Sequence, residues 1–144
     1  MRAVIQRVKE ASVDVFGSCV GAIQKGYLIY LGMTHEDQEE TAIKLANKVL
    51  KLRVFDDQDG KLNLNIHQAG GDMLVVSQFT LYGDIKGSNR PSFIQAARPD
   101  IAEHLYDVFV HELRKHVHVE TGVFQAHMDV KSSNDGPVTI FIEY

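Results

Sequence analysis

The sequence has only one cysteine among its 144 residues, so neither an internal disulfide nor a metal site built from several cysteines can form. A single thiol fits a reducing compartment. Cys19 has no histidine close to it in the sequence, and we expect it to be a small packed residue rather than a nucleophile. The start of the chain lacks the continuous apolar stretch of a secretory signal, and the longest apolar run, Tyr27 to Leu31, is far too short to span a membrane. We therefore expect a cytoplasmic protein without a membrane partner.

An excess of positive charge is also missing. The formal net charge is −4, which argues against broad non-specific binding to nucleic acid but leaves room for a local basic patch. Apolar residues make up 44% and charged residues 24% of the chain, the composition of an ordinary globular protein. No repeat or low-complexity tract interrupts it. The length and composition predict one domain over residues 1–144.

Short strands dominate the predicted elements of the first half. Valines and isoleucines recur between Ala3 and Val15, a pattern that predicts two short strands. A more continuously apolar segment, Ala22–Leu31, predicts a buried strand that ends at Gly32. The segment Asp56–Lys61 contains Asp-Gly and predicts a tight turn. A calcium loop is the weaker alternative there, because the full twelve-residue pattern of ligands is missing.

Two amphipathic helices are predicted. The first begins at Thr34, which resembles a helix cap, and carries its apolar face on Ala42, Leu45, Ala46, Val49 and Leu52. The second begins at Pro99 and ends before His116. Further strands are expected over Met73–Phe79, Gly122–Val130 and Val138–Glu143, the last two joined by a polar loop. The order of elements favours a mixed α/β fold with mainly antiparallel sheets.

The common sequence motifs of hydrolases and nucleotide-binding enzymes are absent. The chain has no G-x-S-x-G elbow, no phosphate-binding Walker loop and no dinucleotide fingerprint. Seven histidines are present, and a metal site that includes His116 and His118 is one interpretation of them. Solvent-exposed histidines are the better interpretation, because no carboxylate spacing completes a metal site.

Two polar segments lie at the ends of predicted strands. Ser77–Thr80 follows an apolar run, so its hydroxyl and backbone N–H groups emerge together at a strand end. Asn134–Thr139 contains Gly136-Pro137, whose peptide bond is a candidate for the cis form. Taken alone, hydroxyl residues such as those of Ser77–Thr80 most often form hydrogen bonds with nearby backbone groups. A segment such as Asn134–Thr139 is most often an ordinary turn.

Together with two further segments, these motifs resemble one family from end to end. The segments Met1–Val8, Ser77–Leu81, Gly87–Phe93 and Asn134–Thr139 are similar to those of the D-aminoacyl-tRNA deacylase family. The resemblance implies a barrel-like core with two main helices and a carboxylic ester hydrolase without metal or other cofactor. The expected substrates are D-aminoacyl-tRNA and glycyl-tRNA mischarged on tRNA(Ala), with L-aminoacyl-tRNA rejected. It also implies a homodimer with active sites at the subunit interface.

The resemblance also assigns roles to single residues. It places a catalytic set at the end of the strand, namely Ser77, Gln78, Phe79 and Thr80. It implies a substrate-binding set around a cis peptide that projects into the partner's pocket, formed by Gly136 and Pro137 with Asn134, Thr139 and a supporting Arg7. An aminoacyl ester is already activated, so positioning, water and stabilisation of the oxyanion suffice for its hydrolysis. We favour a non-covalent route in which Thr80 is not the nucleophile, because no base adjoins it in the sequence.

Two rival functions remain open at this point. The first is a non-catalytic dimeric module on the same fold that binds RNA or protein. The second is a relative that corrects L-alanine on a non-cognate tRNA, which would carry Gly-Thr where this chain has Gly136-Pro137. The cations of Lys86, Arg90 and Arg98 are candidates for contact with tRNA phosphates, although solvated surface charges are an equally good interpretation.

Overall fold

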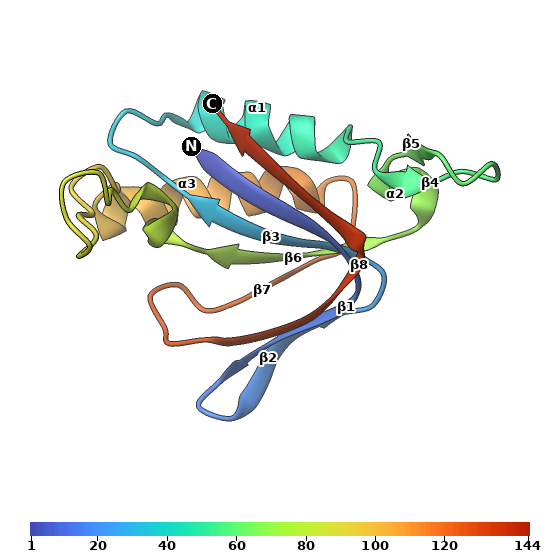
Figure 1. The fold of residues 1–144 in the computed structure, drawn as a ribbon, viewed down its shortest axis with the longest axis horizontal. Helices are drawn as coiled ribbons and strands as arrows, with labels where there is room; N and C mark the ends of the chain where they lie inside the picture. The colour runs from blue at the N-terminus through green and yellow to red at the C-terminus, as the bar shows by residue number, and fades with distance from the viewer.

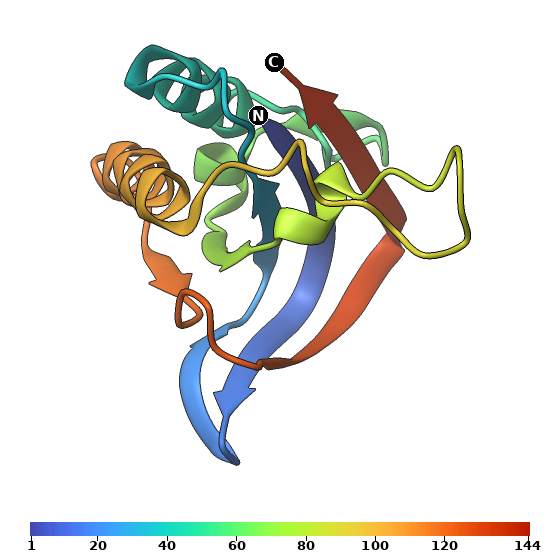
Figure 2. The same cartoon turned by 90° about the vertical axis from the view of Figure 1, so that its left-hand side faces the viewer.

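A strongly curved sheet with helices on one side forms the body of the protein (Figures 1 and 2). The computed structural model describes all residues, 1–144. The main sheet contains β1 (Arg2–Val15), β2 (Ser18–Ile23), β3 (Gly26–Gly32), β6 (Asp72–Ser77), β7 (Val119–Thr121) and β8 (Asp129–Glu143). A small separate hairpin contains β4 (Phe55–Asp56) and β5 (Leu62–Leu64). The helices are α1 (Glu39–Leu50), α2 (Ile66–Ala69) and α3 (Pro99–Arg114), and a 3₁₀ turn, η1, covers Phe79–Tyr82.

The topology confirms the predicted mixed α/β class. Strand β1 pairs antiparallel with β2, β3 and β8, whereas the β3–β6 and β6–β7 pairs are parallel. Helices α1 and α3 pack side by side on one face of the curved sheet (Figure 2). The main core of 23 buried residues includes residues of both helices and of the sheet, and a second cluster of seven fills the side of β1, β2, β3 and β6 away from them. None of the helices combines the length and apolar character needed to cross a lipid bilayer.

The N-terminal strands differ from the prediction. Instead of two short strands, β1 runs unbroken for 14 residues. The apolar alternation changes phase where Arg7 and Val8 are both buried, and a register shift in the pairing with β8 accommodates that change. The predicted strand Ala22–Leu31 is in turn divided between β2 and β3 by a bend at residues 24–25. Gly32 ends β3, as predicted.

The C-terminal part also differs from the prediction. Residues 122–128 form a loop instead of a strand, and the supposed polar loop Lys131–Pro137 lies inside β8. The reason is pairing: Asp129–Ser133 pairs with Glu10–Asp14 of β1. Backbone groups form this ladder, so the polar side chains remain free to point toward solvent, and their polarity is compatible with a strand.

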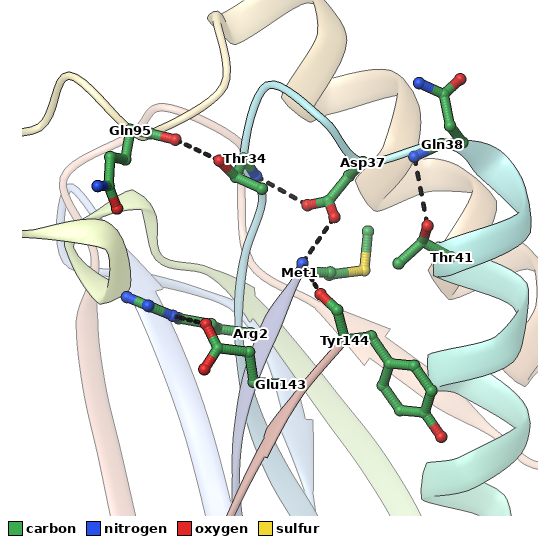
Figure 3. A network of polar contacts seen from close by, with 9 residues as sticks. All are labelled: Met1, Arg2, Thr34, Asp37, Gln38, Thr41, Gln95, Glu143 and Tyr144. Carbon is green, nitrogen blue, oxygen red and sulfur yellow. Dashed lines mark hydrogen bonds and ion pairs between the residues drawn. The ribbon is translucent and has the colours of Figure 1, made fainter.

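The start of α1 differs from the prediction, whereas the start of α3 agrees with it. Helix α1 begins at Glu39 rather than at Thr34, because the Asp37 carboxylate binds the Thr34 backbone N–H (2.8 Å) outside the helix. Gln38 and Thr41 form the capping box instead (Figure 3). Helix α3 begins at Pro99, as predicted. The predicted apolar face of α1 is buried at Ala42, Leu45, Ala46 and Val49, whereas Leu52 lies beyond the helix.

The two chain ends meet around a buried ion pair (Figure 3). The α-ammonium group of Met1 donates to Asp37 Oδ1 at 2.6 Å and to the Tyr144 carbonyl oxygen at 2.7 Å. The Met1 and Asp37 side chains are 0% and 5% exposed, so water screens this pair very little. These bonds connect the segment before α1 to the start of β1 and the end of β8.

Cys19 and the seven histidines are exposed. Cys19, expected to be packed, is exposed on β2, because its strand reaches out to the hairpin tip away from the core (Figure 1). His104 pairs with Glu39 at 2.6 Å and His118 with Glu120 at 2.8 Å, all at the surface. No three histidine, cysteine, aspartate or glutamate side chains are grouped to hold a metal ion. The segment Asp56–Lys61 forms the predicted turn, with Gly60 at a φ of +72°.

Candidate active site

The polar segment Ser77–Thr80 lies where β6 leaves the sheet. The strand predicted over Met73–Phe79 ends at Ser77, and the Gln78 N–H makes a last bond to the Leu31 carbonyl oxygen at 2.8 Å. The chain then turns into η1, which leaves Phe79 and Thr80 exposed. The buried parallel strand thus delivers four polar or aromatic residues to one rim of the sheet.

Two backbone donors at this rim have no partner within the chain. Leu81 N–H donates to the Gln78 carbonyl and Gly83 N–H to the Thr80 carbonyl, whereas the N–H groups of Phe79 and Thr80 meet no acceptor. They are the first donors of a 3₁₀ turn, and such groups are left unpaired by helix geometry. The Gln78 side-chain amide contacts Thr80 Oγ1. This arrangement offers two adjacent N–H groups to an incoming oxygen.

A cavity of about 660 Å³ opens beside this rim. Its walls include Val76–Phe79, where β6 ends and η1 begins, the loop Phe124–Met128, and the segment around the start of α3, with Phe93 and Ala96–Pro99. Eleven of its 17 lining residues are hydrophobic, so the cavity suits a ligand with an apolar body and a few polar groups. Phe79 and Phe93 meet edge to face with ring centroids 4.9 Å apart.

Sequence reasoning missed the wall Phe124–Met128. Its apolar and polar residues alternate, so that it reads as a strand, and no local signal in the sequence marks it as a loop. Gln125 adopts a φ of +61°. Phe124 packs near the ring of Tyr106, whose hydroxyl donates to the Val75 carbonyl at 2.7 Å. Burial raises the pKa of the Tyr106 phenol well above its usual range, so the group remains a neutral donor.

The second predicted segment forms a bulge on β8. Asn134 pairs with Val8 and Thr139 with Gln6, so the residues between them stand out of the ladder. The Gly136–Pro137 peptide is cis, and both residues are exposed. Asn134 closes the bulge, because its Oδ1 accepts from Val138 N–H (3.1 Å) and its Nδ2 donates to Thr139 Oγ1 (3.0 Å).

Arg7 lies under this bulge and is only 6% exposed. Its Nε donates to the Asp135 carbonyl oxygen at 3.1 Å and its Nη1 to the Val54 carbonyl oxygen at 2.8 Å. The carboxylates of Asp56 and Asp135 lie at 3.4 and 3.5 Å from the guanidinium. The cation therefore joins β1, β4 and β8 at one point.

The two predicted segments do not meet within one chain. Gln6, beside the bulge, pairs with Leu28, which pairs with Leu74 in the first half of β6. Ser77 lies at the other end of that strand, about 10 Å farther along at the usual rise per residue. No residue after Val130 lines the cavity. In a single chain, therefore, the Gly136–Pro137 bulge and the cavity are separate features.

Three basic side chains were predicted near the cavity. Arg98 lines it, and its guanidinium pairs with Asp100 at 2.8 Å. The loop that follows η1 extends away from the sheet (Figure 2). Lys86 and Arg90 are exposed in this loop.

A model of the D-Tyr-tRNA(Tyr) deacylase family matches residues 4–143, almost the whole chain. The chain belongs to this family. Relatives named D-aminoacyl-tRNA deacylase come from Thermus aquaticus, 57% identical, and Symbiobacterium thermophilum, 56% identical, each alignment covering 99% of this chain and 95% of the relative. A third deacylase, from Bacillus anthracis, is 53% identical over 99% of both chains.

Two solved structures share the fold of this chain. A protein titled c-Myc DNA Unwinding Element Binding Protein is 39% identical, with a TM-score of 0.95 over 100% of this chain and 99% of that one. A probable eukaryotic D-amino acid tRNA deacylase is 18% identical, with a TM-score of 0.84 over 98% and 97%, and supports the fold alone. This D-aminoacyl-tRNA deacylase family member is thus an enzyme, a hydrolase that acts on D-aminoacyl-tRNA.

Proposed function

We propose that this deacylase is a chiral proofreading enzyme that cleaves D-aminoacyl-tRNA and glycyl-tRNA mischarged on tRNA(Ala), and spares L-aminoacyl-tRNA. The observation that carries the proposal is the Gly136–Pro137 bulge, exposed and held from below by the buried Arg7. Both residues are exposed, and exposed carbonyl oxygens can accept hydrogen bonds from an α-amino group. The proposal places the enzyme, as one domain over residues 1–144, in the cytoplasm, where translation takes place.

The working unit in this proposal is a homodimer. The bulge and the cavity lie apart in one chain, so a second copy supplies the Gly136–Pro137 loop to each cavity. Exposed apolar side chains at the rim and on β8 support such an interface, because Phe79 is 58% and Phe141 is 56% exposed. Phe141 pairs with Val4 across the β1–β8 ladder, which places it on the outer face of the sheet.

Hydrolysis in this site needs position and charge stabilisation more than a reactive side chain. The free N–H groups of Phe79 and Thr80 donate to the oxygen on which negative charge develops. The cavity holds the terminal adenosine and the amino acid, and the substrate's own 2′-hydroxyl orients the attacking water. The structure gives the Thr80 hydroxyl the Gln78 amide as its partner, and an amide is not a general base.

Chirality follows from exclusion. With the α-amino group bound to the carbonyl oxygens of Gly136 and Pro137, the side chain of an L-amino acid points into the bulge and that of a D-amino acid points away from it. Glycine has no side chain to exclude. Because nothing in this arrangement reads the D side chain, discrimination among D-amino acids should be loose.

The proposal is tested with D-Tyr-tRNA, L-Tyr-tRNA and glycyl-tRNA incubated with purified, chelator-treated protein. We expect rapid loss of the D and glycyl esters and survival of the L ester. If no ester is cleaved faster than in buffer, the non-catalytic binding module becomes the better hypothesis. If D-Tyr-tRNA is cleaved but chemically different D-aminoacyl-tRNAs are not, exclusion of the L side chain is not the basis of selectivity.

Thr80→Ala tests the non-covalent route. We expect the variant to keep measurable turnover, within about tenfold of the wild type, whereas loss of a true nucleophile typically costs about 10⁴-fold or more. Single-turnover deacylation of D-Tyr-tRNA measures this difference. An acyl-enzyme trapped on Thr80 would show that the hydroxyl attacks the ester after all.

A further inference from the structure

We propose that Asp56 is a positioning residue that fixes the Gly136–Pro137 bulge through Arg7, and thereby contributes to the selectivity for D over L esters. Asp56 lies on β4, does not line the cavity, and contacts the supporting residue Arg7. Its influence is exerted through one guanidinium group. The inference rests on the proposed function, since it concerns the selectivity of the same site.

The Arg7 guanidinium lies between two carboxylates on different elements. Its Nη1 is 3.4 Å from Asp56 Oδ1 on the hairpin side, and its Nε is 3.5 Å from Asp135 Oδ2 on the bulge side. The hydrogen bonds follow the same arrangement, because Nη1 donates to the Val54 carbonyl on the hairpin side and Nε donates to the Asp135 carbonyl on the bulge side. Arg7 is therefore held from the hairpin while it holds the bulge.

The bulge depends on Arg7 because the sheet does not support it. Residues 135–138 make no ladder pair with β1, and Asn134 bonds only the far end of the bulge, at Val138. Arg7 also packs against the turn itself, since a Cβ atom placed on Gly136 would lie 3.1 Å from Arg7 Nη2. A shift of the guanidinium is thus transmitted directly to the Gly136 backbone.

The hairpin that carries Asp56 is a firm support. Its neighbours Val54 and Phe55 are buried, and the Phe55 ring stacks on Tyr27 with centroids 5.1 Å apart. In the following turn the Asp57 carboxylate accepts bonds from the N–H groups of Asp59 and Lys61 and from the Asn63 amide. Asp56 is thus anchored on both sides, unlike a carboxylate on a free loop.

Removal of the Asp56 charge leaves the electrostatic attraction on the Arg7 guanidinium unequal on its two sides. Asp135 is then the only carboxylate near the guanidinium, and the cation is drawn from the hairpin toward the bulge. The carbonyl oxygens of Gly136 and Pro137 lose their fixed position, so the α-amino group binds less well and the L side chain is excluded less strictly. The Asp56 side chain is half-exposed, which limits the effect to several-fold.

The test compares Asp56→Asn with Asp59→Asn, a matched change in the same turn whose side chain does not contact Arg7. We expect Asp56→Asn to lower the ratio of kcat/KM for D-Tyr-tRNA to that for L-Tyr-tRNA by about twofold to fivefold, the effect of a half-exposed ion pair. Asp59→Asn should leave the ratio unchanged. Both variants should melt within a degree or two of the wild type, about what a small surface change produces, which separates positioning from loss of fold.

A double-mutant cycle with Arg7→Gln, which removes the cation, identifies the route. If Asp56 acts through the Arg7 charge, the effect of Asp56→Asn on the ratio disappears in the Arg7→Gln background. An unchanged ratio in Asp56→Asn, or an equal drop with and without Arg7→Gln, would overturn the inference while leaving the proposed function intact. Failure of the wild-type protein to cleave D-Tyr-tRNA would overturn the proposed function and this inference together.

Discussion

Gly136→Ala is expected to lower kcat/KM for D-aminoacyl-tRNA by about 100-fold or more, the usual cost of misplacing a binding group by about 1 Å. Gly136 has a φ of +126°, which side-chain-bearing residues rarely adopt. A Cβ atom there would also lie 2.9 Å from Val138 Cγ2 and 3.1 Å from Arg7 Nη2. The bulge must move to relieve these contacts, and its carbonyl oxygens then leave their place. Steady-state deacylation of D-Tyr-tRNA measures the loss.

Gly87→Ala is a suitable control for this experiment. A Cβ atom on Gly87 meets nothing within 4 Å, so the variant should cleave D-Tyr-tRNA like the wild type. Circular dichroism should show both variants folded, because the bulge is exposed and outside the core. If Gly136→Ala retains activity within a few-fold of the Gly87→Ala control, the bulge does not bind the substrate as proposed.

Asp37→Asn is expected to lower the free energy of unfolding by about 3 kcal/mol, at the lower end of what a broken buried ion pair costs. The α-ammonium of Met1 lies 2.6 Å from the carboxylate, and both side chains are almost fully buried. Asparagine keeps an oxygen for the Thr34 N–H but leaves the ammonium charge without a counter-ion. Urea denaturation followed by circular dichroism gives the difference.

Asp100→Asn provides the comparison for Asp37→Asn. It removes a carboxylate of the same type from the pair with Arg98, whose two side chains are 70% and 65% exposed, so stability should change far less than in Asp37→Asn. A similar, small effect of both substitutions would mean that the buried pair at the chain ends contributes little to stability.

Local patterns predicted the helices well and the strands less well. The apolar face of α1 and the start of α3 at Pro99 depend on neighbouring residues alone. The start of α3 is confirmed, and so is the face of α1 except for Leu52, which lies beyond the helix. The strand errors have a different origin, because strand limits depend on distant partners. Lys131–Pro137 is polar enough to be a loop, yet β1 provides it with a partner, and the same long partner makes β1 continuous.

In the site, too, the features that depend on neighbouring residues were predictable and those that depend on distant contacts were not. The position of Ser77–Thr80 at a strand end was predictable, and so was the Gly136–Pro137 peptide as a candidate cis bond. The wall Phe124–Met128 was not, because its alternation mimics a strand. Neither was Asp56, since its contact with Arg7 joins residues 49 positions apart and no local pattern records such a contact. The roles of the individual site residues stay predictions until the variants are measured.

The pairing of β1 with β8 also determines when, during synthesis, the main sheet can finish folding. Residues 2–14 are synthesised before residues 129–143, which contain their pairing partners. Until then one long edge of β1 exposes unpaired N–H and C=O groups, the arrangement that promotes aggregation of nascent β-proteins. A topology with such distant contacts folds slowly for its size, so the yield of active protein should depend on synthesis rate and on chaperones that shield the waiting strand.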